Sequence, residues 1–206
     1  MSRRMPMFPL GSVLFPHAVL PLHIFEPRYR VLMFDCTRGE PEFGVVLIER
    51  GSEVGGDDER FAVGTVARIV AARELPDGRW MLNAVGDRRF RVTEWLPDDP
   101  YPIALVTELD EQPWQAADDA ALCKAEALVR RALTLIAELG EPAPPATVEL
   151  SGEGSVAAWQ LAAIAPLGHL DKLRLLDVDD HRARLEALSE MTQEELSVLA
   201  YRLGRG

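Results

Sequence analysis

The sequence predicts an α+β protein in which a β-rich first half is followed by a bundle of helices. Up to about residue 112, apolar residues alternate with polar ones or form short runs between turn residues, as strands require. Beyond that point, leucine, alanine and valine recur at three- and four-residue steps, the spacing of one helix face. We therefore expect a single domain over residues 1–204, with a β subdomain at 1–112 and a helical subdomain at 113–204.

The β part is predicted around one long hairpin. Residues 63–75 and 79–96 flank Asp77-Gly78, a strong turn signal because hairpin turns need residues that tolerate positive φ. Residues 43–49 form a continuous apolar run, typical of a strand covered on both faces. Gly86 indicates a bulge or bend in the second hairpin strand. Short strands with close turns favour a small, curled, barrel-like sheet.

One short helix is predicted to interrupt the sheet. Pro27 suits a first helical position, and Glu26 before it complements the helix dipole. Gly39 supplies the end of the helix, and Glu26 is placed to pair with Arg30 across one turn. One face of this helix is apolar and consists of Tyr29, Leu32, Met33 and Cys36.

The second half is predicted to hold four to five helices. A long amphipathic helix spans residues 122–139, and shorter periodic runs follow at 156–164, 170–176, 185–191 and 192–203. Thr192 and Glu195 have the spacing of a capping box, so we expect a new helix to begin at Thr192. Ser155 is expected to cap the second helix of the bundle.

Composition and charge narrow the classes of function. The 206 residues are 48% apolar and 27% charged, as in ordinary globular proteins, and the net charge is -11. This field repels phosphate groups, so we expect neither nucleic acid nor membrane as a partner. There is no run of about 18 apolar residues, and prolines interrupt the N-terminal region where a signal peptide would need one. We expect a cytoplasmic protein in which Cys36 and Cys123 are both buried, unpaired thiols.

Two charged clusters are candidate sites. Arg88, Arg89 and Arg91 form the densest basic group, and apolar Phe90 and Val92 alternate with them. This period of two predicts that Arg89 and Arg91 are exposed on one strand, and an RNA-binding face is the alternative.

An acidic loop carries the second cluster, with side chains of Glu53, Asp57, Asp58 and Glu59. Clustered carboxylates suit hard cations, but the spacing does not match a calcium loop. We expect a solvated loop and no metal.

The most informative segment is His23-Ile24-Phe25-Glu26-Pro27-Arg28-Tyr29-Arg30. It follows Phe8-Pro9-Leu10-Gly11, Leu14-Phe15-Pro16 and Leu20-Pro21-Leu22. Together these segments resemble the opening of the N-terminal domain of Lon proteases, the part that handles substrates rather than cutting them. Later segments resemble the same domain in the same order. The resemblance implies a six-stranded pseudo-barrel of the PUA-like type, a helical bundle, and a stand-alone form without the ATPase and protease domains.

Motifs for catalysis are missing from the sequence. Neither lysine lies in a Gly-Lys-Ser/Thr phosphate loop, because Cys123 precedes Lys124 and Asp171 precedes Lys172. There is no Gly-x-Ser-x-Gly elbow and no Gly-x-Gly-x-x-Gly motif. The four histidines, at 17, 23, 169 and 181, have no metal-ligand spacing. We expect no enzymatic activity and no cofactor, and a cryptic hydrolase with distant Ser, His and Asp is the alternative.

The resemblance therefore implies binding of polypeptide. Its expected partners are exposed apolar stretches of client proteins, a protein partner for which the domain acts as an adaptor, or a second copy of the chain. The candidate contact residues are Phe15, Pro16, Phe25 and Tyr29 near the proline-rich opening, and Trp80 on the hairpin. Burial in the core is the competing expectation for each, since aromatic side chains are usually inside.

Overall fold

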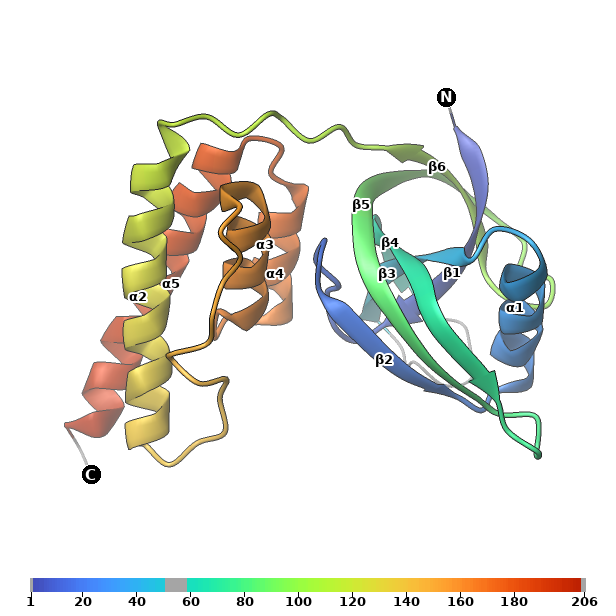
Figure 1. Ribbon diagram of the computed structural model, residues 1–206, viewed down its shortest axis with the longest axis horizontal. Helices are drawn as coiled ribbons and strands as arrows, with labels where there is room; N and C mark the ends of the chain where they lie inside the picture. Colours follow the sequence, from blue (N-terminus) through green and yellow to red (C-terminus); the bar gives the residue numbers. More distant parts are fainter. Residues whose placement is uncertain (1, 51–58, 205–206) are drawn as a thin grey trace. The chain divides into compact units, whose positions relative to one another are not determined.

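The computed structural model describes residues 2–50 and 59–204, which form two compact units (Figure 1). The units span Met1–Asp110 and Glu111–Gly206. Among the described residues, six strands and one helix lie in the first unit, and four helices lie in the second. This confirms the predicted α+β class, with a six-stranded sheet, one short helix beside it and a bundle for which four to five helices were predicted. Whether the two units act as one domain over residues 1–204 stays a prediction, as does the PUA-like assignment.

The strands of the first unit form a sheet that closes on itself. They are β1 (Arg3–Leu10), β2 (Val19–Ile24), β3 (Glu42–Arg50), β4 (Glu59–Glu74), β5 (Trp80–Leu96) and β6 (Ile103–Glu108). Their order is β2-β5-β4-β3-β1-β6, and an additional β5–β6 pairing joins the ends. Only β1 and β3 run parallel among these pairs. Five strands thus form a ring, and β2 extends it along the first half of β5.

The β4–β5 hairpin has the predicted turn and bulge. Gly78 adopts a φ of 77°, and its N–H donates to the Leu75 carbonyl at 2.8 Å. The register slips beside Gly86, and a Cβ there would overlap the Phe15 carbonyl. Glycine therefore lets the segment before β2 cross close to β5, where the His17 N–H donates to the Gly86 carbonyl at 2.7 Å.

The bulge also overturns one prediction about charged residues. Arg89 was expected to be exposed, yet it is completely buried, as is the neighbouring Phe90. Between Thr65 and Ala67, β4 advances two residues while β5 advances three, from Gly86 to Arg89. This extra residue breaks the strict alternation of sides on which the prediction depended.

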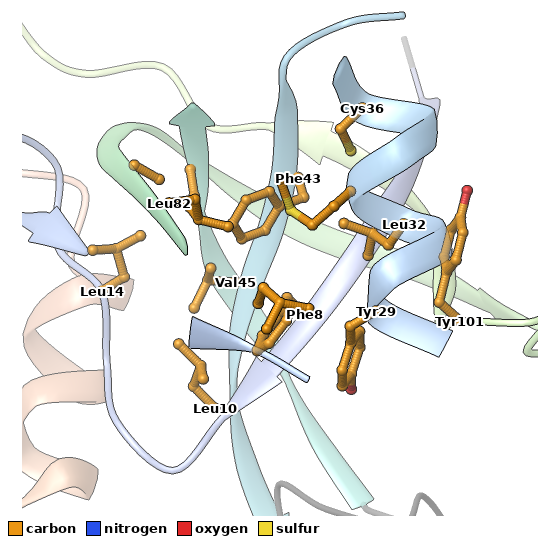
Figure 2. Packing of buried hydrophobic residues seen from close by; sticks show 14 of the residues in the cluster. Phe8, Leu10, Leu14, Tyr29, Leu32, Cys36, Phe43, Val45, Leu82 and Tyr101 are labelled. Carbon is orange, nitrogen blue, oxygen red and sulfur yellow. The ribbon is translucent and has the colours of Figure 1, made fainter. Parts of the chain in front are cut away.

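Helix α1 (Pro27–Arg38) covers the apolar interior of the first unit. Its four buried residues are those predicted, namely Tyr29, Leu32, Met33 and Cys36. Figure 2 shows Leu32 and Cys36 pointing from the helix toward Phe43 of β3. The Tyr29 ring stacks on Phe8 of β1 with centroids 4.1 Å apart.

The predicted pairing of Glu26 with Arg30 is wrong. Glu26 accepts a hydrogen bond from Arg28 at 3.1 Å, and Arg28 also covers the Tyr29 ring. The Arg30 side chain instead extends to the β4–β5 turn, where it lies against Gly78. Glu26 is the N-cap residue and has an extended backbone conformation, and its carboxylate contacts Arg28, two residues along the chain.

The second unit consists of α2 (Asp118–Glu138), α3 (Gly154–Ile164), α4 (His169–Asp177) and α5 (His181–Leu203). The predicted long helix corresponds to α2, and its buried face includes Ala125, Val129 and Ile136. Ala132 and Ile136 of α2 pack with Leu196 and Leu199 of α5.

Two predicted helix starts are wrong. The runs at 185–191 and 192–203 belong to one continuous helix, in which Thr192 is fully buried and caps nothing. The buried positions Leu185, Leu188, Leu196 and Leu199 keep one helical face through this point, so packing favours continuity over the local cap signal. Helix α3 starts at Gly154 after Glu153, and Ser155 donates its hydroxyl hydrogen to the Glu153 carboxylate.

The cysteines differ in environment, contrary to prediction. Cys36 is buried as expected, but Cys123 is exposed on α2, because it lies outside the face that packs inward. Burial, together with the nearby charges of Asp35 and Glu42, raises the pKa of the Cys36 thiol to about 12. No helix in the described part of the chain is both long and apolar enough to cross a membrane.

The two thiols should react at very different rates. At pH 8 we expect Cys123 to be alkylated rapidly and Cys36 only on unfolding, because Cys36 is both inaccessible and protonated. Mass spectrometry of timed iodoacetamide reactions would count the modified sites. Cys123→Ser should leave a protein with no fast-reacting thiol, and two fast thiols in the wild type would contradict the structure.

Replacing Thr192 tests the continuity of α5. Its buried hydroxyl has no hydrogen-bond partner among the described residues. The isosteric change Thr192→Val should therefore leave the free energy of unfolding unchanged or raise it by up to about 1 kcal/mol. Urea unfolding would measure the difference. If Thr192 were an N-cap, the same change would cost about 1 kcal/mol instead.

Candidate functional site

A groove of about 430 Å³ lies between the outer side of α1 and the end of the β4–β5 hairpin. Both elements belong to the first unit (Figure 1). The groove is lined by Pro27, Arg30, Val31 and Phe34 of α1 and by Glu74, Gly78 and Trp80 of the hairpin. Most of these side chains are apolar, and Arg30 and Glu74 supply the charges.

Helix α1 is apolar on its outer side as well as on its buried side. Val31 is 42% exposed and Phe34 is 45% exposed, although both are large hydrophobic residues. Phe25, just before the helix, is 53% exposed. Pro27, Val31 and Phe34 are spaced at i, i+4 and i+7, so they lie along one helix face. The helix thus has two apolar faces, of which one packs on the core and the other is exposed.

The structure separates the candidate contact residues into two groups. Phe15 and Tyr29 are 1% and 2% exposed, and Pro16 is also buried, so these three belong to the core. Burial in the core was the competing expectation for these three residues and is what is found, while contact with a client stays a prediction. Phe25 stays at the surface, and Trp80 is half-buried in the groove wall.

Sequence reasoning missed two residues of this surface, Val31 and Phe34. Their signal was present in the spacing from Pro27, which marks a second apolar stripe on the same helix. The stripe was overlooked because the stronger stripe through Tyr29, Leu32 and Cys36 already accounted for the helix.

A second hollow, of about 360 Å³, lies on the outward side of β2, β5 and β4. Small residues such as Pro21, Ala71 and Asn83 form its floor, and Met81 lies beside them. His23 also lines it, whereas no Phe, Tyr or Trp side chain of the described residues does. The hollow is apolar as well, but the groove beside α1 has the larger apolar side chains, those of Phe34 and Trp80.

The arginine cluster does not form a basic face. Arg88 contacts the carboxylates of Glu42, Asp87 and Glu108 at 3.2, 2.7 and 2.7 Å. Arg89 is buried, which leaves only Arg91 of the three exposed. The charge of Arg88 is thus neutralised locally, which argues against the RNA-binding alternative.

The histidine most engaged in contacts is His181, which is buried in the second unit. Its Nε2 lies 2.8 Å from the Gln112 carbonyl, and its Nδ1 lies 3.2 Å from the Arg184 guanidinium. Arg184 in turn stacks over the Trp159 ring at 3.6 Å. Since both ring nitrogens are occupied, His181 is placed to hold the segment before α2 rather than to act as a base.

Within the described residues, candidate metal ligands are not brought together, and neither lysine contacts a serine. No group of three or more His, Cys, Asp or Glu residues suited to a metal occurs within residues 2–50 and 59–204. The acidic residues 53, 57 and 58 lie outside the described residues, and Glu59 begins β4. Lys124 is exposed, and Lys172 donates to the Ala163 carbonyl at 2.7 Å rather than to a serine. Burial lowers the pKa of Lys172.

Similar folds occur among solved structures. A Lon N-terminal domain protein from Xanthomonas campestris is 30% identical, with a TM-score of 0.62 over 90% of this chain and 96% of that chain. The N-terminal domain of a Mycobacterium avium complex Lon protease is 18% identical. It has a TM-score of 0.63 over 93% of this chain and 98% of that one, which supports the fold alone.

Sequence comparison gives the same relationship. Lon proteases of Koribacter versatilis and Anaeromyxobacter dehalogenans are 29% and 28% identical over 96% and 95% of this chain. The chain spans about a quarter of the length of these curated relatives. The family model described as the ATP-dependent protease La (LON) substrate-binding domain matches residues 4–194. The chain therefore belongs to the Lon substrate-binding domain family.

Proposed function

We propose that this protein is a polypeptide-binding module that works without chemistry of its own and contacts its clients through the groove between α1 and the β4–β5 hairpin. The observation that carries the proposal is the exposed apolar stripe of Pro27, Val31 and Phe34 facing Trp80 across the groove. Membership of a substrate-binding family supports recognition of protein substrates. The location of the contact surface is inferred from the structure.

A protein that binds unfolded chains needs exposed apolar surface of its own. Val31 and Phe34 are exposed rather than part of the core, and contiguous exposed apolar surface commonly marks an interaction site. Unfolded polypeptides present aliphatic and aromatic side chains that folded proteins hide. Burying such side chains in the groove would discriminate unfolded from folded clients without a sequence motif.

The contacts in the described part of the chain favour binding over hydrolysis. His181 has both ring nitrogens in contact with protein groups, and Lys172 bonds a carbonyl. Neither is poised to activate a hydroxyl nucleophile, which would need a nearby base with a free acceptor. The proposed role is direct holding of clients, and delivery of clients to a protease is a narrower form of the proposal.

A pair of matched valine substitutions tests the contact surface. Val31 on α1 and Val198 on α5 are 42% and 52% exposed, so Val→Glu at either site should be tolerated by the fold. Val31→Glu should weaken binding of a reduced, alkylated, fluorescently labelled unfolded protein roughly tenfold, because about 1.5 kcal/mol of apolar burial is lost. Fluorescence anisotropy titrations would give both dissociation constants.

Val198→Glu should leave the dissociation constant unchanged, since the same charge is added far from the groove in sequence and in a different unit. Equal effects of the two substitutions would show that the groove is not the contact surface. A wild-type protein that does not bind the unfolded chain would overturn the polypeptide-binding proposal itself.

A further inference from the structure

Within the described residues, Arg30, the cation of the groove, lacks the carboxylate or aromatic partner that several other arginines of this unit have. Arg28 contacts Glu26 at 3.1 Å, Arg79 contacts Asp77 at 2.7 Å, and Arg38 stacks on Phe34 at 3.9 Å. Arg30 is half-buried in the groove wall, and no carboxylate lies within 4 Å of it in the described residues. A guanidinium at a largely apolar surface that forms no ion pair is an available anion-binding group.

The Arg30 side chain packs against the hairpin turn. Gly78 has positive φ and no side chain, and a Cβ at this position would lie 2.8 Å from the Arg30 Cζ. The guanidinium therefore occupies the space that any other residue at position 78 would fill. The stem of Arg30 starts from α1, so the charge is held against the turn in the groove wall.

The charges around Arg30 restrict which anions can approach it. Glu74 lines the same groove, and Asp77 borders the adjoining hollow beside the turn. The whole chain carries a net charge of -11. A ligand with several negative charges would be repelled, whereas a single carboxylate beside apolar groups would gain from Arg30 at small electrostatic cost.

We propose that this groove captures the C-terminal end of a client chain, with the terminal carboxylate on Arg30 and the last apolar side chains against Val31, Phe34 and Trp80. The inference rests on the proposed polypeptide binding and names the part of the client that is recognised. A chain terminus carries its carboxylate on the main chain, directly beside its last side chain, so both reach a groove of about 430 Å³ together. An internal Asp or Glu brings two flanking chain segments into the same space.

Three peptides and three variants test this inference. The peptides share a short apolar sequence with an N-terminal fluorescein, and they end in a free carboxylate, in an amide, or in an amide with one internal glutamate. The protein variants are Arg30→Met, Arg30→Lys and Arg68→Met. Arg68 is an exposed arginine of β4 that does not line the groove, so Arg68→Met controls for loss of one positive charge. Circular dichroism would establish that each variant is folded.

The wild type and Arg68→Met should bind the free-carboxylate peptide about tenfold more tightly than the amide, the size expected of a charge-assisted hydrogen bond. Arg30→Met should bind the amide as the wild type does and lose the preference, and Arg30→Lys should keep part of it. These results would support capture of a chain end.

Equal binding of the free-carboxylate and amide peptides to the wild type would overturn this inference while leaving the polypeptide-binding proposal intact. Equal binding of the free-carboxylate and internal-glutamate peptides would also overturn it, because the groove would then recognise any carboxylate. Failure to bind any of the peptides, together with failure to bind the unfolded protein, would overturn both proposals.

Discussion

The first unit depends on the length of one strand, β5. Its first residues pair with β2, its last residues pair with β6, and β4 runs beside both parts. A straight strand of 17 residues cannot serve all three neighbours, so the chain bends at the bulge beside Gly86. Glycine is needed there because the segment leading into β2 crosses against its backbone. The closed sheet, the buried Arg89 and the position of the hairpin end all follow from this bend.

The hairpin and α1 then create the candidate surface together. Because Tyr29 and Leu32 anchor the inner side of α1 in the core, its outer side must face away from it. Most exposed helix faces carry charged residues, but here Val31 and Phe34 occupy that side. The hairpin end supplies Trp80 as the opposite wall, and the Arg30 guanidinium packs against its Gly78. The apolar groove is therefore formed by one helix and one hairpin end, including the turn residue Gly78.

The sequence predicted the features that depend on neighbouring residues better than those that depend on tertiary packing. The turn at Asp77-Gly78, the bulge at Gly86 and the buried face of α1 were predictable, since backbone conformation and periodicity are local. The continuity of α5 through Thr192 was not, because the cap signal was overridden by packing with α2. Burial of Phe15 and Tyr29, against exposure of Phe25, was undecidable from residue type. All three are aromatic, and only the fold determines which are covered.

The segment from His23 to Arg30 illustrates why family resemblance and site assignment are separate problems. Ile24 and Tyr29 fill the core, Glu26 and Arg28 satisfy each other, and Phe25 and Arg30 remain at the surface. Successive residues of a helix point about 100° apart, so Tyr29 and Arg30 face the core and the groove from adjacent positions. A motif with this arrangement identifies the fold through its buried members. Its recognition properties belong to the members that the fold leaves exposed, and under the proposed function these can change without disturbing the core.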